Sequence, residues 1–351
     1  MDTRDTPEQA ELRRSARQLT RELGPATVAD LDDAAPRRLR RAAVRDAGWL
    51  ELRDGDDAGP LASGVEGAIV ADALGGAVAD VGFAGPVLAG DLARRAAVRE
   101  TGGAVVAFSP ALVEHAIVST GPTSTPLYAV DDDDAGDAYV FVPEGDGYRL
   151  ASVRLDAAAV SVGSDLTRAV RVIPPGSTPQ VIAGQGRLLT GDDLAEWSAL
   201  GLALTSADLV GGMRGVLDIT VAYAAERKQY GVPVGSFQAV QHLLAEARCL
   251  MEGSQSVALH ASWAVDHLAP AAARTAGRVA KTYCARAARV VCETAVQVHG
   301  GIGNTWECMA HVYLRRALLS SQWFGDDGVQ LLALGRERFG PQGVKVAHGL
   351  S

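Results

Sequence analysis

The stretch QVHGGIGNTWE, residues Gln297–Glu307, lies in the last third of the chain and combines a run of glycines with a helix-start signal. Its three glycines leave backbone N–H groups uncovered by side chains, which suits close approach of a pyrophosphate. The same residues are also typical of a tight turn between two helices, and no predicted strand precedes them. Asn304 and Glu307 have the spacing of a capping box and predict that a helix begins at Asn304.

A second segment, RKQYG at Arg227–Gly231, follows a long amphipathic stretch. The Arg227 guanidinium is suited to donate two hydrogen bonds to phosphate oxygens. An arginine at a helix C-terminus also offsets the helix dipole, so the residue alone does not distinguish a ligand site from a helix end. Ser236 is predicted to cap the helix that follows.

Composition restricts the class of protein. The chain has 351 residues, 48% of them apolar, and a formal net charge of −9. No basic stripe with interleaved aromatics is present, which argues against nucleic-acid binding. The four cysteines lack a C-x-x-C spacing, so neither disulfides nor a zinc site is predicted. The charged N-terminus is unlike a signal peptide and no apolar run approaches the length of a bilayer, so a cytoplasmic protein without membrane contact is expected.

The periodicity of apolar residues predicts an α+β fold in three parts. Residues 1–100 read as an N-terminal α-helical domain. Residues 101–188 contain short β-branched runs between Gly, Pro and Asp clusters and predict a reduced middle β-domain, in which Asp131–Asp134 forms a solvated hairpin loop. Residues 189–351 predict a C-terminal four-helix bundle that opens with one long helix, Trp197–Glu226.

The segments Arg227–Gly231, Phe237-Gln238 and Gln297 with its glycine turn, in this α, β, α order, resemble the acyl-CoA dehydrogenase family over nearly the whole chain. The specificity lies mostly in the C-terminal half. The resemblance implies FAD as cofactor, at positions that reach across a dimer interface to an FAD held chiefly by the neighbouring subunit. The positions so implied are Arg227, Gln229, Tyr230, Phe237, Gln238, Gln297, Gly300 and Gly301.

The family's reaction removes a proton and a hydride from the two carbons next to a thioester carbonyl, and it needs a carboxylate base. The resemblance places that base at Phe324, just before Gly325, and phenylalanine cannot take a proton. Asp326 and Asp327, slightly further along, are the outside candidates for a base.

A second position for the base in this family lies near Gly201, where no carboxylate is found. Leu202 also occupies a position that is usually arginine, and Glu196 lies too far upstream to be assigned. The middle region departs as well, because it lacks both the Thr-Glu-Pro-like loop and the Trp-containing strand that cover the flavin ring in ordinary members.

Three hypotheses follow. The first is the small, non-catalytic subunit of a heteromeric acyl-CoA dehydrogenase acting on bulky, steroid-type thioesters. In an α2β2 assembly it would complete the FAD site of a catalytic partner, which binds most of the acyl-CoA. The second is a self-sufficient dehydrogenase that uses Asp326 or Asp327. The third is a flavin-free scaffold that inherited the fold.

Overall fold

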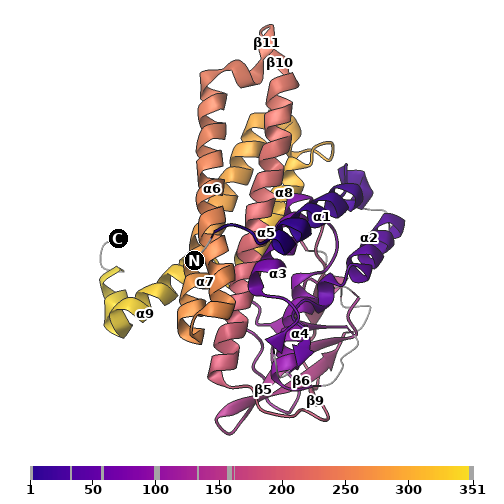
Figure 1. The fold of residues 1–351 in the computed structure, drawn as a ribbon, viewed down its shortest axis with the longest axis vertical. Coiled ribbons are helices and arrows are strands. Elements are labelled where there is room, and N and C mark those ends of the chain that lie inside the picture. The colour runs from indigo at the N-terminus through magenta and orange to yellow at the C-terminus, as the bar shows by residue number, and fades with distance from the viewer. Residues whose placement is uncertain are drawn as a thin grey trace.

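The computed structural model describes residues 3–31, 34–56, 59–98, 103–132, 134–155, 160–161 and 163–347. Helices form both terminal parts of the chain, and the β-sheet that lies between them in sequence sits at the lower end of the view in Figure 1. The longest helices run parallel to the long axis of the molecule. The predicted α+β class is therefore confirmed.

The N-terminal part is helical, as its apolar periodicity predicted. Thr6 caps the first helix by accepting a hydrogen bond from the Gln9 backbone, and Ser63 begins another with a capping box to Glu66. The elements of this part are α1 (Pro7–Leu23), η1 (Val28–Leu31), α2 (Ala34–Asp46), η2 (Trp49–Glu51), β1 (Gly55–Asp56), β2 (Gly59–Pro60), α3 (Gly64–Gly76) and α4 (Ala84–Arg95).

The middle part forms a seven-stranded sheet in the order β7-β8-β4-β3-β5-β6-β9, and of the strand pairs formed by its described residues only β3–β5 is parallel. Alternate residues point to its two faces, and Phe108 and Phe141 point toward the helices. The strands are β3 (Ala104–Phe108), β4 (Leu127–Val130), β5 (Asp137–Glu144), β6 (Gly147–Arg154), β7 (Val160–Ser161), β8 (Val170–Ile173) and β9 (Gln180–Val181).

The C-terminal part is a bundle of long helices, as predicted. α5 packs on α6, α7 and α8, and α9 extends to one side against α7 (Figure 1). The elements are α5 (Gly191–Glu226), β10 (Lys228–Gln229), β11 (Val232–Pro233), η4 (Val234–Ser236), α6 (Gln238–His267), α7 (Pro270–His299), η5 (Gly300–Asn304), α8 (Ala310–Gln322) and α9 (Asp327–Ala347).

Two predicted helix starts are wrong. Ser236 does not cap α6, because its hydroxyl donates to the Pro233 carbonyl and Phe237 holds the N-cap position. Asn304 ends the 3-10 turn η5, and the next α-helix begins only at Ala310. Both motifs lie in connecting turns, where a local hydroxyl or amide has backbone partners other than a helix N-terminus.

The sequence predicted no segment with the length and composition of a membrane span, and this prediction is wrong for α5. An 18-residue window of this helix has a mean hydropathy of 1.2, but 89% of that window is buried inside the protein. Its apolar character belongs to the centre of the bundle, where it contacts helices on several sides.

A buried ionic network joins the three parts of the chain. Asp208 of α5 accepts hydrogen bonds from Arg316 (2.8 Å) and from Ser320 (2.7 Å), both on α8. Arg168, next to the sheet, pairs with Asp208 at 2.9 Å and with Asp131 at 3.1 Å. Asp131 in turn accepts from the backbone N–H groups of residues 83–85, at the start of α4.

This network overturns the prediction of a solvated loop at Asp131–Asp134. Asp131 and Asp132 are buried, with 1% and 3% of their surface exposed, and Asp132 pairs with Arg171. Asp134 is exposed, and residue 133 lies outside the described residues. The basic partners come from distant parts of the chain, so a local reading of the acidic run could not supply them.

We expect Asp208→Asn to lower the free energy of unfolding by about 3–5 kcal/mol at pH 7, because two buried guanidinium groups lose their carboxylate. Asp218→Asn, on an exposed position of the same helix, is the matched control and should change it by less than about 0.5 kcal/mol. Urea unfolding of both variants measures the difference. Equal stabilities would contradict the role given to the network.

The same carboxyl predicts a pH dependence. Burial opposes ionisation of Asp208, but the nearby Arg168 and Arg316 lower the pKa of Asp208 to about 2. Because this pKa lies below the unfolded value, the stabilisation is complete above about pH 4 and is lost as the pH falls toward 2. Asp208→Asn should show less loss of stability than the wild type across that interval.

Candidate functional site

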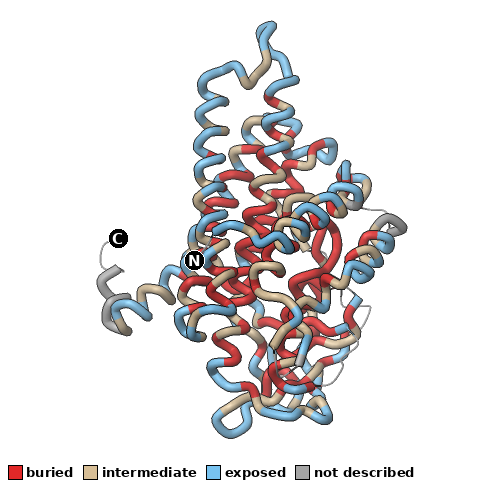
Figure 2. Tube along the Cα trace, in the orientation of Figure 1, coloured by how far each residue is buried: buried red, intermediate tan, exposed pale blue. Residues whose placement is uncertain are grey.

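The segment Arg227–Gly231 forms the exposed tip of the bundle. α5 ends at Glu226, and the β10–β11 hairpin that follows turns at Tyr230 (φ 53°) and Gly231 (φ 82°). Two successive residues with positive φ are typical of a tight hairpin turn. The turn leaves Tyr230 94% exposed, and Figure 2 shows the whole tip at the surface.

The glycine turn lies at the same end of the bundle as this hairpin. α7 ends at His299, and Gly300 follows with φ 67°, a conformation that favours glycine. One helical turn before Arg227, Tyr223 stacks on the ring of His299 with 4.4 Å between ring centroids. Its hydroxyl also donates to the His299 carbonyl at 3.3 Å. Tyr223 therefore holds the two predicted cofactor segments together.

The predicted cofactor residues share one property, which is exposure to solvent. Within the described residues, the Arg227 side chain makes no ion pair or hydrogen bond. An exposed guanidinium beside a glycine turn with open backbone suits a phosphate group that arrives from outside the chain. The exposed members are Arg227, Gln229, Tyr230, Phe237, Gln238, Gln297, Gly300 and Gly301.

The other candidate site, the expected position of the catalytic base at Phe324, is closed to solvent. Phe324, between α8 and α9, is only 4% exposed and adopts a left-handed backbone with φ 66°. Its backbone N–H donates to the Leu112 carbonyl at 2.8 Å, and its carbonyl accepts from Gln330. These contacts hold a strained conformation that directs the ring inward.

The Phe324 ring lies within a group of aromatic side chains from three parts of the chain. Its centroid is 5.1 Å from that of Phe108 on β3, 5.3 Å from Trp197 on α5 and 5.9 Å from Trp323. We call these four residues, together with Phe141 on β5, the aromatic cluster. They fill the junction between the sheet and the bundle with tightly packed rings.

The two positions expected for the catalytic base meet in this cluster. A Cβ atom placed on Gly201 would lie 2.1 Å from Cζ of Phe324, so the ring packs directly against the backbone of α5. Leu202, the next residue, is buried. Neither position carries a carboxylate, and the ring occupies the space that a side chain at Gly201 would need.

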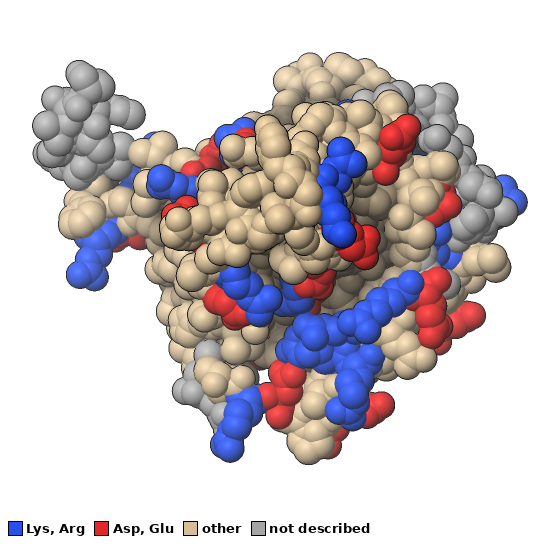
Figure 3. Space-filling view, turned by 90° about the horizontal axis from the view of Figure 1, so that it is seen from above, with Lys and Arg blue, Asp and Glu red and all other residues tan. Residues whose placement is uncertain are grey.

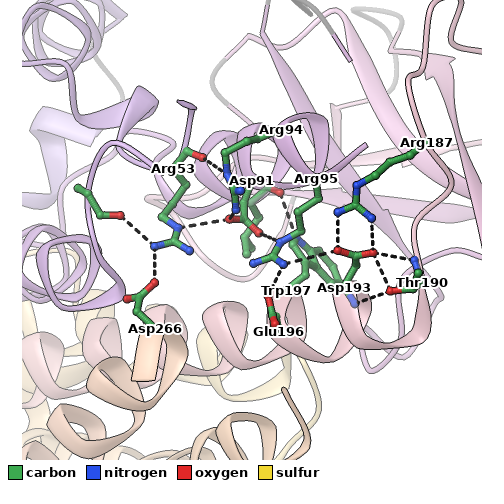
Figure 4. Close-up of polar contacts among 12 residues, drawn as sticks. Arg53, Asp91, Arg94, Arg95, Arg187, Thr190, Asp193, Glu196, Trp197 and Asp266 are labelled. Atoms are coloured by element: carbon green, nitrogen blue, oxygen red, sulfur yellow. Dashed lines mark hydrogen bonds and ion pairs between the residues drawn. The ribbon is translucent and has the colours of Figure 1, made fainter. Parts of the chain in front are cut away.

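A hydrogen bond to α4 anchors Trp197 on the other side of the cluster, and ion pairs connect α4 to neighbouring parts of the chain (Figure 4). Its indole N–H donates to the Leu88 carbonyl of α4 at 3.0 Å. Asp91, on the same helix and fully buried, pairs with Arg53 (3.3 Å) and Arg95 (2.6 Å). Arg95 also pairs with Glu196, which places that carboxylate in a structural contact.

His115 belongs to the same junction, and the sequence contains no motif that singles it out. Its ring lies 4.4 Å from that of Phe141 and 5.7 Å from that of Trp197. Burial lowers the pKa of His115 to about 4, so the imidazole is neutral at pH 7.

Asp326 has a structural position at the start of α9. Its carboxylate accepts a hydrogen bond from the Val329 backbone N–H at 2.8 Å, the contact of an N-cap. Asp327 follows in the first helical turn. Among the described residues, no group of three or more His, Cys, Asp or Glu side chains is placed to hold a metal ion.

Comparisons with known proteins agree with the fold and identify the family. The family described as "Acyl-CoA dehydrogenase, C-terminal domain" matches residues 200–338. The acyl-CoA dehydrogenase IpdE2 of Mycolicibacterium smegmatis is 32% identical over 267 residues, which cover 71% of this chain and 80% of that protein. The chain belongs to the acyl-CoA dehydrogenase family.

Two solved structures share this fold at low sequence identity. The crystal structure of the ChsE4-ChsE5 complex from Mycobacterium tuberculosis matches with a TM-score of 0.73 at 22% identity, over 96% of this chain and 98% of the matched chain. The structure of the Tcur3481-Tcur3483 steroid ACAD G363A variant matches with a TM-score of 0.71 at 22% identity, over 98% of this chain and 99% of the matched chain.

We expect Gly201→Ala to lower the free energy of unfolding by about 1–3 kcal/mol, because the added methyl group overlaps the Phe324 ring. Gly212→Ala is the matched control on the same helix, where an added Cβ meets no atom closer than 3.9 Å. It should be neutral or stabilising by up to about 1 kcal/mol. Thermal or urea unfolding compares the two.

Phe324→Ala alone should lower the free energy of unfolding by about 3–5 kcal/mol. In that background the cost of Gly201→Ala should disappear, because the ring that it displaces is gone. Additive costs in the double variant would show that the two positions are not in contact.

Asp326→Ala should destabilise the protein by about 1 kcal/mol through loss of the helix cap, whereas Asp326→Asn, which preserves capping, should have little effect. Neither change should alter turnover of the active assembly, as measured with an acyl-CoA and an artificial electron acceptor. Loss of turnover in Asp326→Asn with its stability retained would instead support the second hypothesis, in which Asp326 is the base.

Proposed function

We propose that this chain is the non-catalytic subunit of a heteromeric, FAD-dependent acyl-CoA dehydrogenase. The observation that carries the proposal is the packing of the Phe324 ring on Gly201, which fills both positions where the family places its base. The contrast with the exposed tip supports it, since one set of family residues is available to a neighbour and the other is buried.

The chemistry explains why this packing matters. Desaturation next to a thioester carbonyl requires a base that reaches the α-proton. Phe324 has no titratable group, Asp326 is engaged as a helix cap, and His115 is half-buried against the rings of Phe141 and Trp197. The aromatic cluster also fills this junction with packed rings, whereas a flavin ring needs space and polar groups that hold and tune it. The chain's own pocket therefore does not fit a working flavin site.

The tip residues fit a cofactor held by another subunit. FAD supplies the hydride acceptor in this family of enzymes. In this chain Arg227 would pair with its phosphates, and Gln297 with the open glycine turn would donate hydrogen bonds to the same part of the cofactor. The contact between Tyr223 and His299 orients the two segments before binding, so less order must be imposed when the subunits meet.

The partner in this proposal is a catalytic acyl-CoA dehydrogenase subunit in an α2β2 assembly, which binds most of the acyl-CoA. A two-component structure, the ChsE4-ChsE5 complex, and a steroid ACAD have the same fold. They support a heteromeric assembly and a bulky, steroid-type acyl group. A cytoplasmic location fits such a thioester substrate.

The test is to purify the chain alone and together with a candidate catalytic subunit, and to count flavin per chain by absorbance. We expect no flavin with the chain alone and one FAD per catalytic subunit in the complex. A yellow, active assembly made of this chain alone would overturn the proposal.

Within the complex, Arg227→Ala should lower FAD affinity by about 10-fold or more, because a charge-assisted contact to phosphate contributes about 1.5–3 kcal/mol. Arg149→Ala, on the β5–β6 hairpin, removes an arginine from the surface of the sheet and should leave FAD content unchanged. Equal FAD retention in both variants would favour a flavin-free scaffold.

A further inference from the structure

A cleft separate from both candidate sites lies between α1, α3, α5 and α6. The face of the molecule shown in Figure 3 is hollowed, and Lys and Arg side chains gather beside the hollow. The cleft encloses about 350 Å³, within the range of small-molecule sites. Three arginines line it, Arg13 and Arg17 from α1 and Arg214 from α5, and we call it the arginine cleft.

We propose that the arginine cleft binds a small organic carboxylate that carries an apolar body. The three guanidinium groups converge on one buried carboxylate, that of Asp72 on α3. Arg214 takes both of its oxygens at 2.7 Å, and Arg13 is satisfied by Asp5 at 2.7 and 2.9 Å. The positive charge of Arg17 is the least well paired of the three. Its guanidinium nitrogen lies 3.6 Å from an Asp72 carboxylate oxygen that already accepts a hydrogen bond from Arg214.

The charges of the cleft do not balance. The lining contains three arginines and two aspartates, so its formal charge is 3 − 2 = +1 in a chain whose net charge is −9. Burial and the neighbouring Arg214 lower the pKa of Arg17, as expected for a cation held near other cations. One added anion would restore balance and would gain charge-assisted hydrogen bonds in a partly desolvated site.

The floor of the cleft explains why the anion should carry an apolar body. Ile69 and Ala68 of α3, Val210 and Ala207 of α5 and Ala258 of α6 line it with buried apolar side chains. A cationic rim over an apolar floor is the pattern that orients an amphiphile, with the carboxylate at the arginines and the hydrocarbon below.

This inference is independent of the proposed function. The cleft shares no residue with the exposed tip or with the aromatic cluster, so a binding result here does not depend on whether the chain lends residues to a partner's FAD.

The test is calorimetric titration of the full-length chain, with its partner if they purify together, using sodium decanoate at low ionic strength. We expect one saturable site per chain, with an affinity that weakens as salt is added. Arg17→Gln should weaken binding about 10-fold or more. Arg14→Gln is the matched control, since Arg14 also lies on α1, is exposed and pairs with Glu11; its affinity should stay within about twofold of the wild type.

Three further probes make the outcome decisive. Decylammonium and decanol should bind more weakly than decanoate, and inorganic phosphate should not compete with it at equal concentration. Absence of saturable binding, equal affinity in Arg17→Gln, or phosphate binding as tightly as decanoate would each overturn the proposal. Arg17→Lys keeps the positive charge and should bind decanoate more tightly than Arg17→Gln. It is the control for the case in which Arg17→Gln fails to fold.

Discussion

The Asp208 carboxylate is the contact on which the arrangement of the three parts depends. Through Arg168 and Arg316 it connects the long helix α5 to the sheet and to α8, and through Asp131 the same chain of contacts reaches the start of α4. Each of these charges is buried, so removing one partner leaves another without compensation. The network therefore sets how the sheet meets the bundle, and the aromatic cluster lies at that junction.

The packing at this junction separates two sites that a single stretch of sequence brings close together. Gln297–Glu307 ends at an exposed turn, whereas Phe324, only one helix later, points into the interior. α8 carries the chain from the surface to the core, and the two left-handed residues Phe324 and Gly325 form the turn into α9, which extends to one side of the bundle. In the proposed function the family signature and the position of the base belong to different sites, so the chain can keep one and lack the other.

Much of the fold, and the segments that mark the family, could be predicted from the sequence. Long amphipathic helices such as α5 have a strong 3.6-residue periodicity, and the two segments Arg227–Gly231 and Gln297–Glu307 can each be recognised from their residues alone. Local polar motifs were less reliable. Ser236 and Asn304 look like helix caps, but the Ser236 hydroxyl donates to the Pro233 carbonyl and Asn304 ends a 3-10 turn. The acidic run at Asp131 looks solvated, but Arg168, which is distant in sequence, pairs with Asp131 in the fold. The positions of His115 and of the three arginines around Asp72 have no local signal at all, since each depends on which helices pack together.

The sequence by itself determined the α+β class, the bundle, the family and the absence of a carboxylate at Phe324, because residue identity and short-range periodicity carry that information. Only the tertiary structure decided that Phe324 packs on Gly201, that Asp326 is a cap, and that the predicted cofactor residues are exposed together at one end of the bundle. The physical reason is that burial and contact are properties of segments that meet from distant positions in the chain, and helix packing with buried charge pairs selects which segments meet.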